Sequence, residues 1–420
     1  MQSNYSQWRA AHPLVFIATL LLIGVLLAKQ YVQISEAQTF VITISILISS
    51  TGFLLILTIF KIQQSLIGVF TYLVIISWGF AIQIASQNQA LVSIPYPTQI
   101  ILSCRNWVIA KLNATITNKE ANGFAQAIVL GVKSDMDQNL TNAYTQLGIV
   151  HIIAISGMHL EILFKNLKRV TQLLPRNVFF LTLELFFLLT CVWIYTLMAF
   201  ASPSIVRASL FFSIFTIGKF LGASSYMLNT IAGGVLVILL FDIQHLNHIG
   251  LQLSYAAVIG IHLFYKLLFK SIELKNPIIQ FLWSNCCMSL SAQLTTFPIL
   301  ALHFHQIAGW VLVSNFIMVP LSNYILYGLG ILLILPIQIP FTFLWGRMVE
   351  AYIRFFNHFV SSWFSQTKAA SIQISMSGFQ IWMYYLILLF VYLWLYLKQP
   401  KWILAILGLF SIYFLQKLFS

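Results

Sequence analysis

The stretch that decides the fold is His151-Ile-Ile-Ala-Ile-Ser-Gly-Met-His159, in which two histidines, a serine and a glycine interrupt an otherwise apolar run. In lipid every polar group must find a partner, so such residues usually face the interior of a helical bundle or a water-filled path. The stretch therefore predicts a membrane protein with a polar interior.

The composition agrees with this prediction. Hydrophobic residues make up 60% of the 420 residues and charged residues 7%, against roughly 25% charged residues in soluble domains. The mean hydropathy is +0.90, which excludes a soluble protein because too little polar surface is available to cover the fold. The length supplies about ten to twelve spans of ~20 residues each. We expect an all-α, polytopic helical membrane protein with some broken helices.

The charge balance has two interpretations. Lys and Arg number 22 and Asp and Glu 9, which gives a formal charge of +13. Such a charge favours a polyanionic partner, either nucleic acid or anionic lipid. The alternative is that most of these bases are topogenic anchors of the positive-inside kind. Bases at span ends favour the anchors: Lys29, Lys61, Lys398 and Lys401.

Five regions follow from the hydropathy pattern. They are N-terminal transmembrane helices at 1–84, an extracytoplasmic segment with amphipathic helices at 85–150, a helical core at 151–340, an interfacial amphipathic helix and loop at 341–379, and C-terminal transmembrane helices at 380–420. Arg9 and Lys61 favour a cytoplasmic N-terminus, which places 85–150 outside.

Two charged segments bear on sidedness and on the membrane surface. The basic turn from Lys165 to Arg176 is expected to be cytoplasmic. Glu161 and Lys165 are spaced to pair at i,i+4. In the interfacial helix, Glu350 and Arg354 have the same spacing among aromatic residues, and we expect them to pair as well.

The first candidate site is the opening stretch itself. On a helix, Ser156 and His159 share a face, and Gly157 permits a close helix contact or a break. His151 precedes His159 by eight positions, roughly 80° around a helix, so all three polar side chains fit one stripe. The alternative is that Ser156 bonds to its own helix and the histidines lie at the membrane surface. The spacing leaves both open.

The second candidate site is Ala201-Ser-Pro-Ser-Ile-Val-Arg207. Ser202 and Pro203 mark a break at a span boundary, and Arg207 follows in the next apolar run, where it must pair, snorkel or face water. Glu184 is an acid well inside the neighbouring span. The two form an ion pair, or they snorkel separately toward opposite leaflets.

The third and fourth candidate sites are polar positions inside later spans: Gln252, Ser254, Gln293, Pro298 and Asn315. Prolines free backbone carbonyls and amides supply hydrogen bonds, which is how membrane helices build polar cavities. Pro320 is a further candidate break. The alternative is that these groups form interhelical hydrogen bonds that hold the bundle together.

Several kinds of chemistry have no motif here. The four cysteines include no CxxC pair, and His303 and His305 lack a neighbouring carboxylate, so no metal site is predicted. The sequence has no HEXXH, no phosphate-binding glycine loop and no GxSxG elbow. We expect no enzyme, no cofactor and no ATP-driven motor.

Taken in order, these stretches resemble the competence domain of the ComEC family, the inner-membrane channel that passes one strand of transforming DNA into bacteria. The matching stretches are Ala127 to Gly131 with the run up to Gly148, HIIAISGMHL from His151, SPSIVRASL from Ser202, GLQLSYAAVIGI from Gly250, AQLTTFP from Ala292 and NFIMVPL from Asn315. Several spaced motifs in the right order are far more specific than any one of them.

The resemblance implies a bacterial cytoplasmic (inner) membrane channel for single-stranded DNA, with membrane lipid, an outer DNA receptor and a separate cytosolic motor as partners. It implies phosphate contacts for His151, His159 and Arg207, and neutral polar lining for Ser156, Gln252, Gln293 and Asn315. Basic and hydrogen-bonding groups suit a backbone with one negative charge per nucleotide.

The sequence also departs from the family pattern. No HxHxDH zinc cluster of the metallo-β-lactamase-like domain follows residue 325, so we expect a short form without nuclease activity. Glu161 replaces the small residue expected after the second histidine. Two other functions stay open: a proton-coupled transporter of a small solute with Glu184 as proton carrier, and a non-conducting scaffold of an uptake complex.

Overall fold

The computed structural model describes most of the chain. The described residues are 13–31, 71–79, 99–132, 134, 136–175, 177–222, 227–241, 248–367, 371–374, 376–404 and 406–408.

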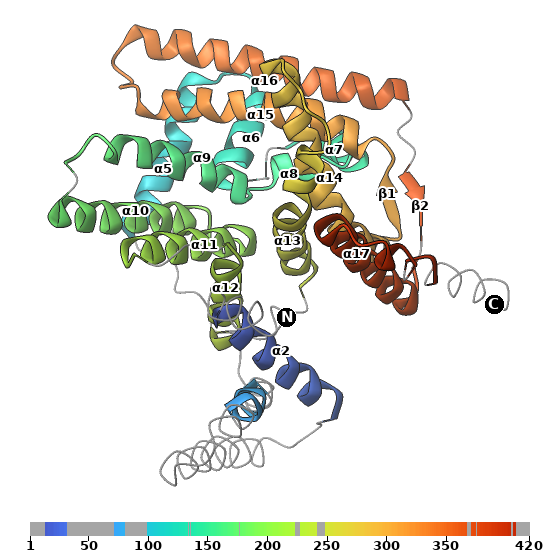
Figure 1. Ribbon diagram of the computed structural model, residues 1–420. Helices are drawn as coiled ribbons and strands as arrows, with labels where there is room; N and C mark the ends of the chain where they lie inside the picture. Colours follow the sequence, from blue (N-terminus) through green and yellow to red (C-terminus); the bar gives the residue numbers. More distant parts are fainter. Residues whose placement is uncertain are drawn as a thin grey trace. The chain divides into compact units, whose positions relative to one another are not determined.

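The described chain is almost entirely helical (Figure 1). Its helices are α2 (Pro13–Tyr31), α5 (Gln99–Thr115), α6 (Lys119–Leu130), α7 (Gln138–Gln146), α8 (Val150–Ile153), α9 (Gly157–Thr171), α10 (Val178–Met198), α11 (Pro203–Phe220), α12 (Met227–Phe241), α13 (Ile249–Phe269), α14 (Pro277–Phe304), α15 (Val311–Ile334), α16 (Pro340–Thr367) and α17 (Gly378–Leu397). The predicted all-α class is confirmed.

Among the described residues, five helices are long and apolar enough to cross a membrane, namely α10, α13, α14, α15 and α17. Shorter apolar helices lie in α2 and α12. The chain is therefore a membrane protein. Of the transmembrane regions predicted at 1–84 and 380–420, residues 32–70 and 409–420 lie outside the described residues. Within α15 the expected break at Pro320 was wrong, because the helix continues through this proline to Ile334.

Two compact units divide the chain. The first comprises 1–96, 175–189 and 209–251. In it, α2 packs along α12 through a small apolar cluster of Leu21, Val25 and Leu239. The backbone of α2 also comes very close to the helical stretch 71–79, because a Cβ placed on Gly79 would lie 2.0 Å from the Leu21 carbonyl oxygen.

The second unit comprises 97–174, 190–208 and 252–420, and it holds an extensive hydrophobic core. Helices α5 to α8 contribute to this core together with α15 and α16, which run side by side (Figure 1). The rings of Phe124, Tyr144 and Phe356 meet at its centre, with centroids 5.9 to 6.3 Å apart. Burying each such ring contributes about 1.5–3 kcal/mol. The segment predicted to be extracytoplasmic thus folds onto the unit as packed helices.

Capping residues set several helix ends. Asn118 accepts a hydrogen bond from the Ala121 amide at 2.9 Å and begins α6, and Gly131 ends it with a φ of +72°. Asn276 caps α14, and Pro277 occupies its first turn, where no amide hydrogen is needed. Pro203 likewise begins α11, which places the helix break where the sequence predicted it.

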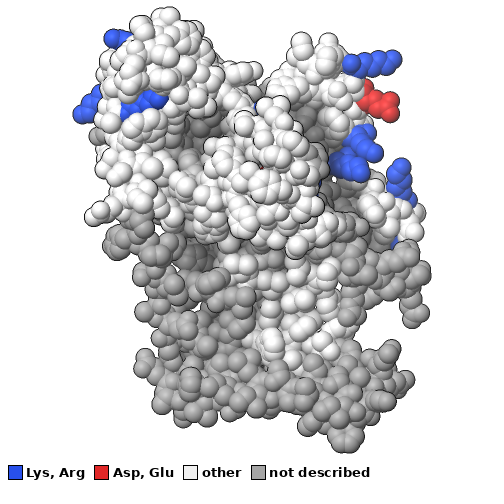
Figure 2. Space-filling model, turned by 90° about the vertical axis from the view of Figure 1, so that its left-hand side faces the viewer, with Lys and Arg blue, Asp and Glu red and all other residues white. Residues whose placement is uncertain are grey.

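The segment after α16, where the sequence predicted a loop, contains a short strand. Residues 306–308 and 371–373 pair as a two-stranded antiparallel sheet, β1 (Gln306–Ala308) with β2 (Ser371–Gln373), which the sequence did not predict. Between the strands, α16 packs against α5, α6, α7 and α15 through its buried face. Among the described residues visible in Figure 2, charged side chains lie near the edges and most of the remaining surface is uncharged.

Candidate functional site

The opening stretch forms a broken helix. The short helix α8 ends at Ile153, Ala154 and Ser156 are extended, and α9 begins at Gly157. The expected continuous stripe from His151 to His159 was therefore wrong, because the interruption changes the angle between the two ring positions. His151 lies exposed on α8, whereas His159 is buried in the first turn of α9.

Ser156 and His159 do meet, as the sequence predicted, but they do so as a cap. The His159 Nδ1 accepts a hydrogen bond from the Ser156 amide at 3.0 Å and lies 3.0 Å from Ser156 Oγ. Burial, opposed by the Ser156 hydrogen bond and aided by the charge of His151, lowers the pKa of His159 to about 4. At neutral pH His159 is therefore uncharged, and its Nε2–H is a neutral donor.

The second stretch packs directly on this broken helix. Ile155 forms a cluster with Ala199 and Ile205, which lie on either side of the break between α10 and α11. A Cβ placed on Gly157 would lie 3.4 Å from the Ala208 side chain, so the start of α9 approaches α11 closely. The small residue at 157 permits this contact, as the sequence analysis expected.

The third and fourth stretches continue the chain of contacts. The side chains of Arg207 on α11 and Tyr255 on α13 lie near enough for a charge on one to act on the other. Thr295 Oγ1 on α14 donates to the Ala256 carbonyl of α13 at 2.7 Å. Beside it, Gly260 faces Ser291 and Thr295 so closely that a Cβ would lie 2.2 Å from Thr295 Oγ1.

Helix α15 connects the fourth stretch with the residues that precede the first stretch. Asn315 Nδ2 lies 3.5 Å from Ser289 Oγ of α14. One residue before it, Ser314 Oγ donates to the Leu147 carbonyl at 2.6 Å, just before the broken helix. Gly148 has a φ of +74°, and a Cβ there would lie 2.7 Å from the Val311 side chain. The four stretches are thus joined in a closed circuit of contacts, which we call the motif circuit.

Three of the four stretches place a polar atom in the interior without a protein partner. His159 Nε2, Ser202 Oγ and Asn315 Oδ1 are buried and have no hydrogen-bond partner in the described part of the chain. An unsatisfied buried group costs about 1–3 kcal/mol. Native proteins tolerate such groups mainly where water, an ion or a substrate completes the bonding. The motif circuit therefore has the polarity of a wet or ligand-binding interior.

The other predicted residues lie on the same helices. Gln252 and Ser254 are half-buried on α13, and Gln293 is half-buried on α14, where Pro298 is buried within the continuous helix. Glu184 lies on α10 in the first unit. Its pairing with Arg207 stays a prediction.

The break between α10 and α11 is held by a residue that the sequence pattern did not indicate. Phe200 and Ala201 both have left-handed backbone conformations, with φ of 53° and 46°. For residues with a Cβ this conformation costs roughly 1–2 kcal/mol each. Arg105 of α5 lies against this turn, with its guanidinium carbon 3.9 Å from the centre of the Phe200 ring. Its only sequence signal is a cation in an otherwise uncharged run before Lys111.

The expected partner of Glu350 was also wrong. Glu350 is 6% exposed, and its Oε2 accepts hydrogen bonds from the Thr117 amide at 2.6 Å and the Asn118 amide at 3.2 Å. It therefore turns into the protein, away from Arg354, and holds the loop between α5 and α6. The pairing of Glu161 with Lys165 is confirmed, with Oε1 and Nζ 2.5 Å apart.

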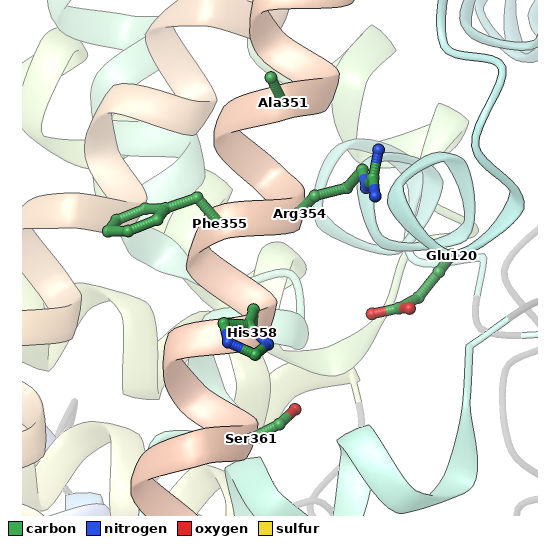
Figure 3. A pocket seen from close by; sticks show the side chains of 6 residues that line it. All are labelled: Glu120, Ala351, Arg354, Phe355, His358 and Ser361. Atoms are coloured by element: carbon green, nitrogen blue, oxygen red, sulfur yellow. The ribbon is translucent and has the colours of Figure 1, made fainter.

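A pocket lies between α6 and α16. It has a volume of about 510 Å³ and is lined by Glu120, Ala351, Arg354, Phe355, His358 and Ser361. Figure 3 shows Arg354, His358 and Ser361 projecting toward Glu120, whereas Phe355 points to the other side of α16. Asn357 Nδ2 donates to Glu120 Oε1 at 3.3 Å. Acid and base face each other here, so the pocket is electrostatically mixed.

No group of three or more metal-ligating side chains occurs in the ranges that the structure describes. The motif circuit itself contains amides, hydroxyls, an arginine and a neutral histidine. These groups bind by hydrogen bonding and charge.

Comparison with known proteins decides the family. A family model described as a competence protein matches residues 128–399, which include all four stretches of the motif circuit. The chain belongs to the competence protein family. Over 226 residues it is 30% identical to ComE operon protein 3 of Bacillus subtilis (strain 168). That alignment covers 53% of the chain but 27% of the relative's length. The resemblance to the ComEC family is thereby confirmed. No solved structure matches.

Proposed function

We propose that this protein forms a conduit for single-stranded transforming DNA across the bacterial cytoplasmic membrane during natural competence. The observation that carries the proposal is the motif circuit with its buried, unpartnered polar atoms, located within the part of the chain that matches the competence family. Groups that lack a protein partner find one in water or in a passing nucleotide. The family membership favours the nucleotide.

The chemistry of the circuit suits a passive role. Arg207 supplies positive charge for phosphate, and His159 and Asn315 supply neutral hydrogen-bonding groups. Such a lining holds a polyanion weakly enough for it to move on. We infer that the chain is not an enzyme, that a separate cytosolic motor pulls the strand, and that an outer receptor delivers it.

Deletion of the gene tests the proposal, with labelled duplex DNA followed into the cell. We expect transformation to be abolished while DNA still accumulates outside the cytoplasmic membrane. Unchanged transformation together with a solute-uptake defect would favour the proton-coupled transporter instead.

Charge reversal tests the lining separately from the fold. Arg207→Glu should reduce transformation by at least about a hundredfold at unchanged protein abundance, because the local charge changes by two units, from attraction to repulsion of each passing phosphate. Arg207→Lys should retain most activity. The matched control is Lys219→Glu, which reverses an exposed charge on the same helix. If both arginine variants transform normally while deletion does not, the protein acts as a scaffold.

A further inference from the structure

The turn between α10 and α11 sets where the second motif begins. Phe200 and Ala201 take left-handed conformations in succession, and neither is glycine. Two hydrogen bonds close the turn, from the Phe200 amide to the Leu197 carbonyl at 3.0 Å and from the Ala201 amide to the Thr196 carbonyl at 2.9 Å. A conformation that the residues themselves disfavour persists only where surrounding structure holds it.

Arg105 supplies such a hold from a distant part of the sequence. It is 9% exposed, and its Nη1 donates to the carbonyl of Met198, the last residue of α10, and to the Leu130 carbonyl of α6 at 3.4 Å. A cation at a helix C-terminus meets the negative end of the helix dipole. The planar guanidinium also lies over the Phe200 ring, which joins cap and turn in one contact.

We propose that Arg105 is a positioning residue of the motif circuit, which clamps the Phe200–Ala201 turn and so fixes the start of α11 with Ser202 and Arg207. This inference rests on the proposed function for its consequence in DNA uptake. The contact of Arg105 with the turn does not depend on that function. It also gives α5 a role: one of its side chains determines the position of groups in the circuit.

Lys111 provides an internal control for the clamp. It lies on the same helix, is 2% exposed and caps the end of α15, with Nζ 2.8 Å from the Leu333 carbonyl and 2.5 Å from the carbonyl of Leu335, the residue that follows the helix. Loss of either cation removes a buried cap. Only the loss of Arg105 releases the turn.

Cysteine labelling tests the clamp without DNA. Ser202→Cys is introduced with the exposed Cys104 replaced by serine, and the full-length protein is labelled in membranes with a maleimide. We expect Arg105→Ala to speed labelling at 202 by about tenfold, equal to 1.4 kcal/mol in the equilibrium of the turn. Lys111→Met should change it by less than about twofold, a difference too small to reflect a released turn.

A second substitution separates a strained turn from a general loss of folding. Ala201→Gly removes the cost of the left-handed conformation at that position. In the Arg105→Ala background it should return labelling toward the parental rate. Arg105→Lys keeps the charge but not the planar fork, so we expect an intermediate rate.

Transformation at matched membrane abundance then reports the functional consequence. Arg105→Ala should transform poorly, and the addition of Ala201→Gly should recover at least part of the loss. Equal labelling in Arg105→Ala and Lys111→Met, or no effect of Ala201→Gly on labelling, would overturn the clamp. If labelling behaves as expected but gene deletion leaves transformation unchanged, the clamp stands and the proposed function fails.

Discussion

At the scale of single residues, buried polar groups decide how the helices are tied together. Burial alone would raise the pKa of Glu350, but hydrogen bonds from Asn118 and Thr117 and the charge of Arg347 outweigh it, so that this pKa lies below its usual value. The ionised carboxylate thus stabilises the fold. A lowered pKa means that this contribution is present above the ordinary carboxyl range and is lost as the pH falls through the folded value.

Glu350→Gln tests this contribution. The substitution should lower the free energy of unfolding at pH 7 by about 1–3 kcal/mol, because two backbone amides lose a charged acceptor. It should also flatten the loss of stability between pH 5 and pH 3, relative to the wild-type protein. Thermal unfolding in detergent across this pH range measures both effects. Glu161→Gln, which removes an exposed pair with Lys165, should change stability by at most about 0.5 kcal/mol.

His159 combines a capping role with a proposed lining role, and two substitutions separate them. His159→Asn keeps an oxygen acceptor near the position of Nδ1, so we expect the Ser156 cap and normal abundance, but reduced transformation because Nε2 is lost. His159→Ala should in addition lower stability by about 1 kcal/mol, the cost of a lost cap. Normal transformation in His159→Asn would contradict the lining role while leaving the cap intact.

At the scale of helices, the close contact between α13 and α14 depends on a glycine at the interface. Because a Cβ on Gly260 would lie 2.4 Å from the Ser291 carbonyl oxygen, Gly260→Ala must push the helices apart. We expect a loss of about 1–3 kcal/mol in stability, measured as a lower unfolding temperature. Gly218→Ala is the matched control, since nothing lies within 4 Å of the added atom there. It should be neutral or slightly stabilising.

Features within one helix could be predicted from the sequence, whereas contacts between helices could not. Ser202 and Pro203 correctly located the start of α11, because this signal lies within the sequence of the break itself. Periodicity also placed Glu161 beside Lys165. It failed for Glu350, because the i,i+4 rule considers one helix, whereas the true partners are amides from another element. Arg105 was missed for the same reason: its role depends on a turn about 95 residues away in sequence.

At the scale of the whole molecule, the broken helix bears on sidedness. The sequence analysis placed 85–150 outside the cell and the basic turn after Lys165 inside, which requires a crossing between them. The structure offers only α8, with four residues, and α9, with 15 residues. At 1.5 Å per residue α9 is about 22 Å long, against ~30 Å of hydrocarbon. It also carries Glu161, Lys165 and further bases, and neither helix qualifies as a span.

We therefore expect both flanks of the broken helix to lie on the same side of the membrane, with His151 to His159 dipping toward the motif circuit. Reporter fusions after Gln146 and after Gln172 should give the same compartment, and a fusion after Phe200, beyond α10, should give the opposite one, because α10 is 21 residues long and qualifies as a span. Opposite compartments for the first two fusions would show that the broken helix crosses completely. Single-cysteine labelling at the same positions in the full-length chain controls for effects of truncation.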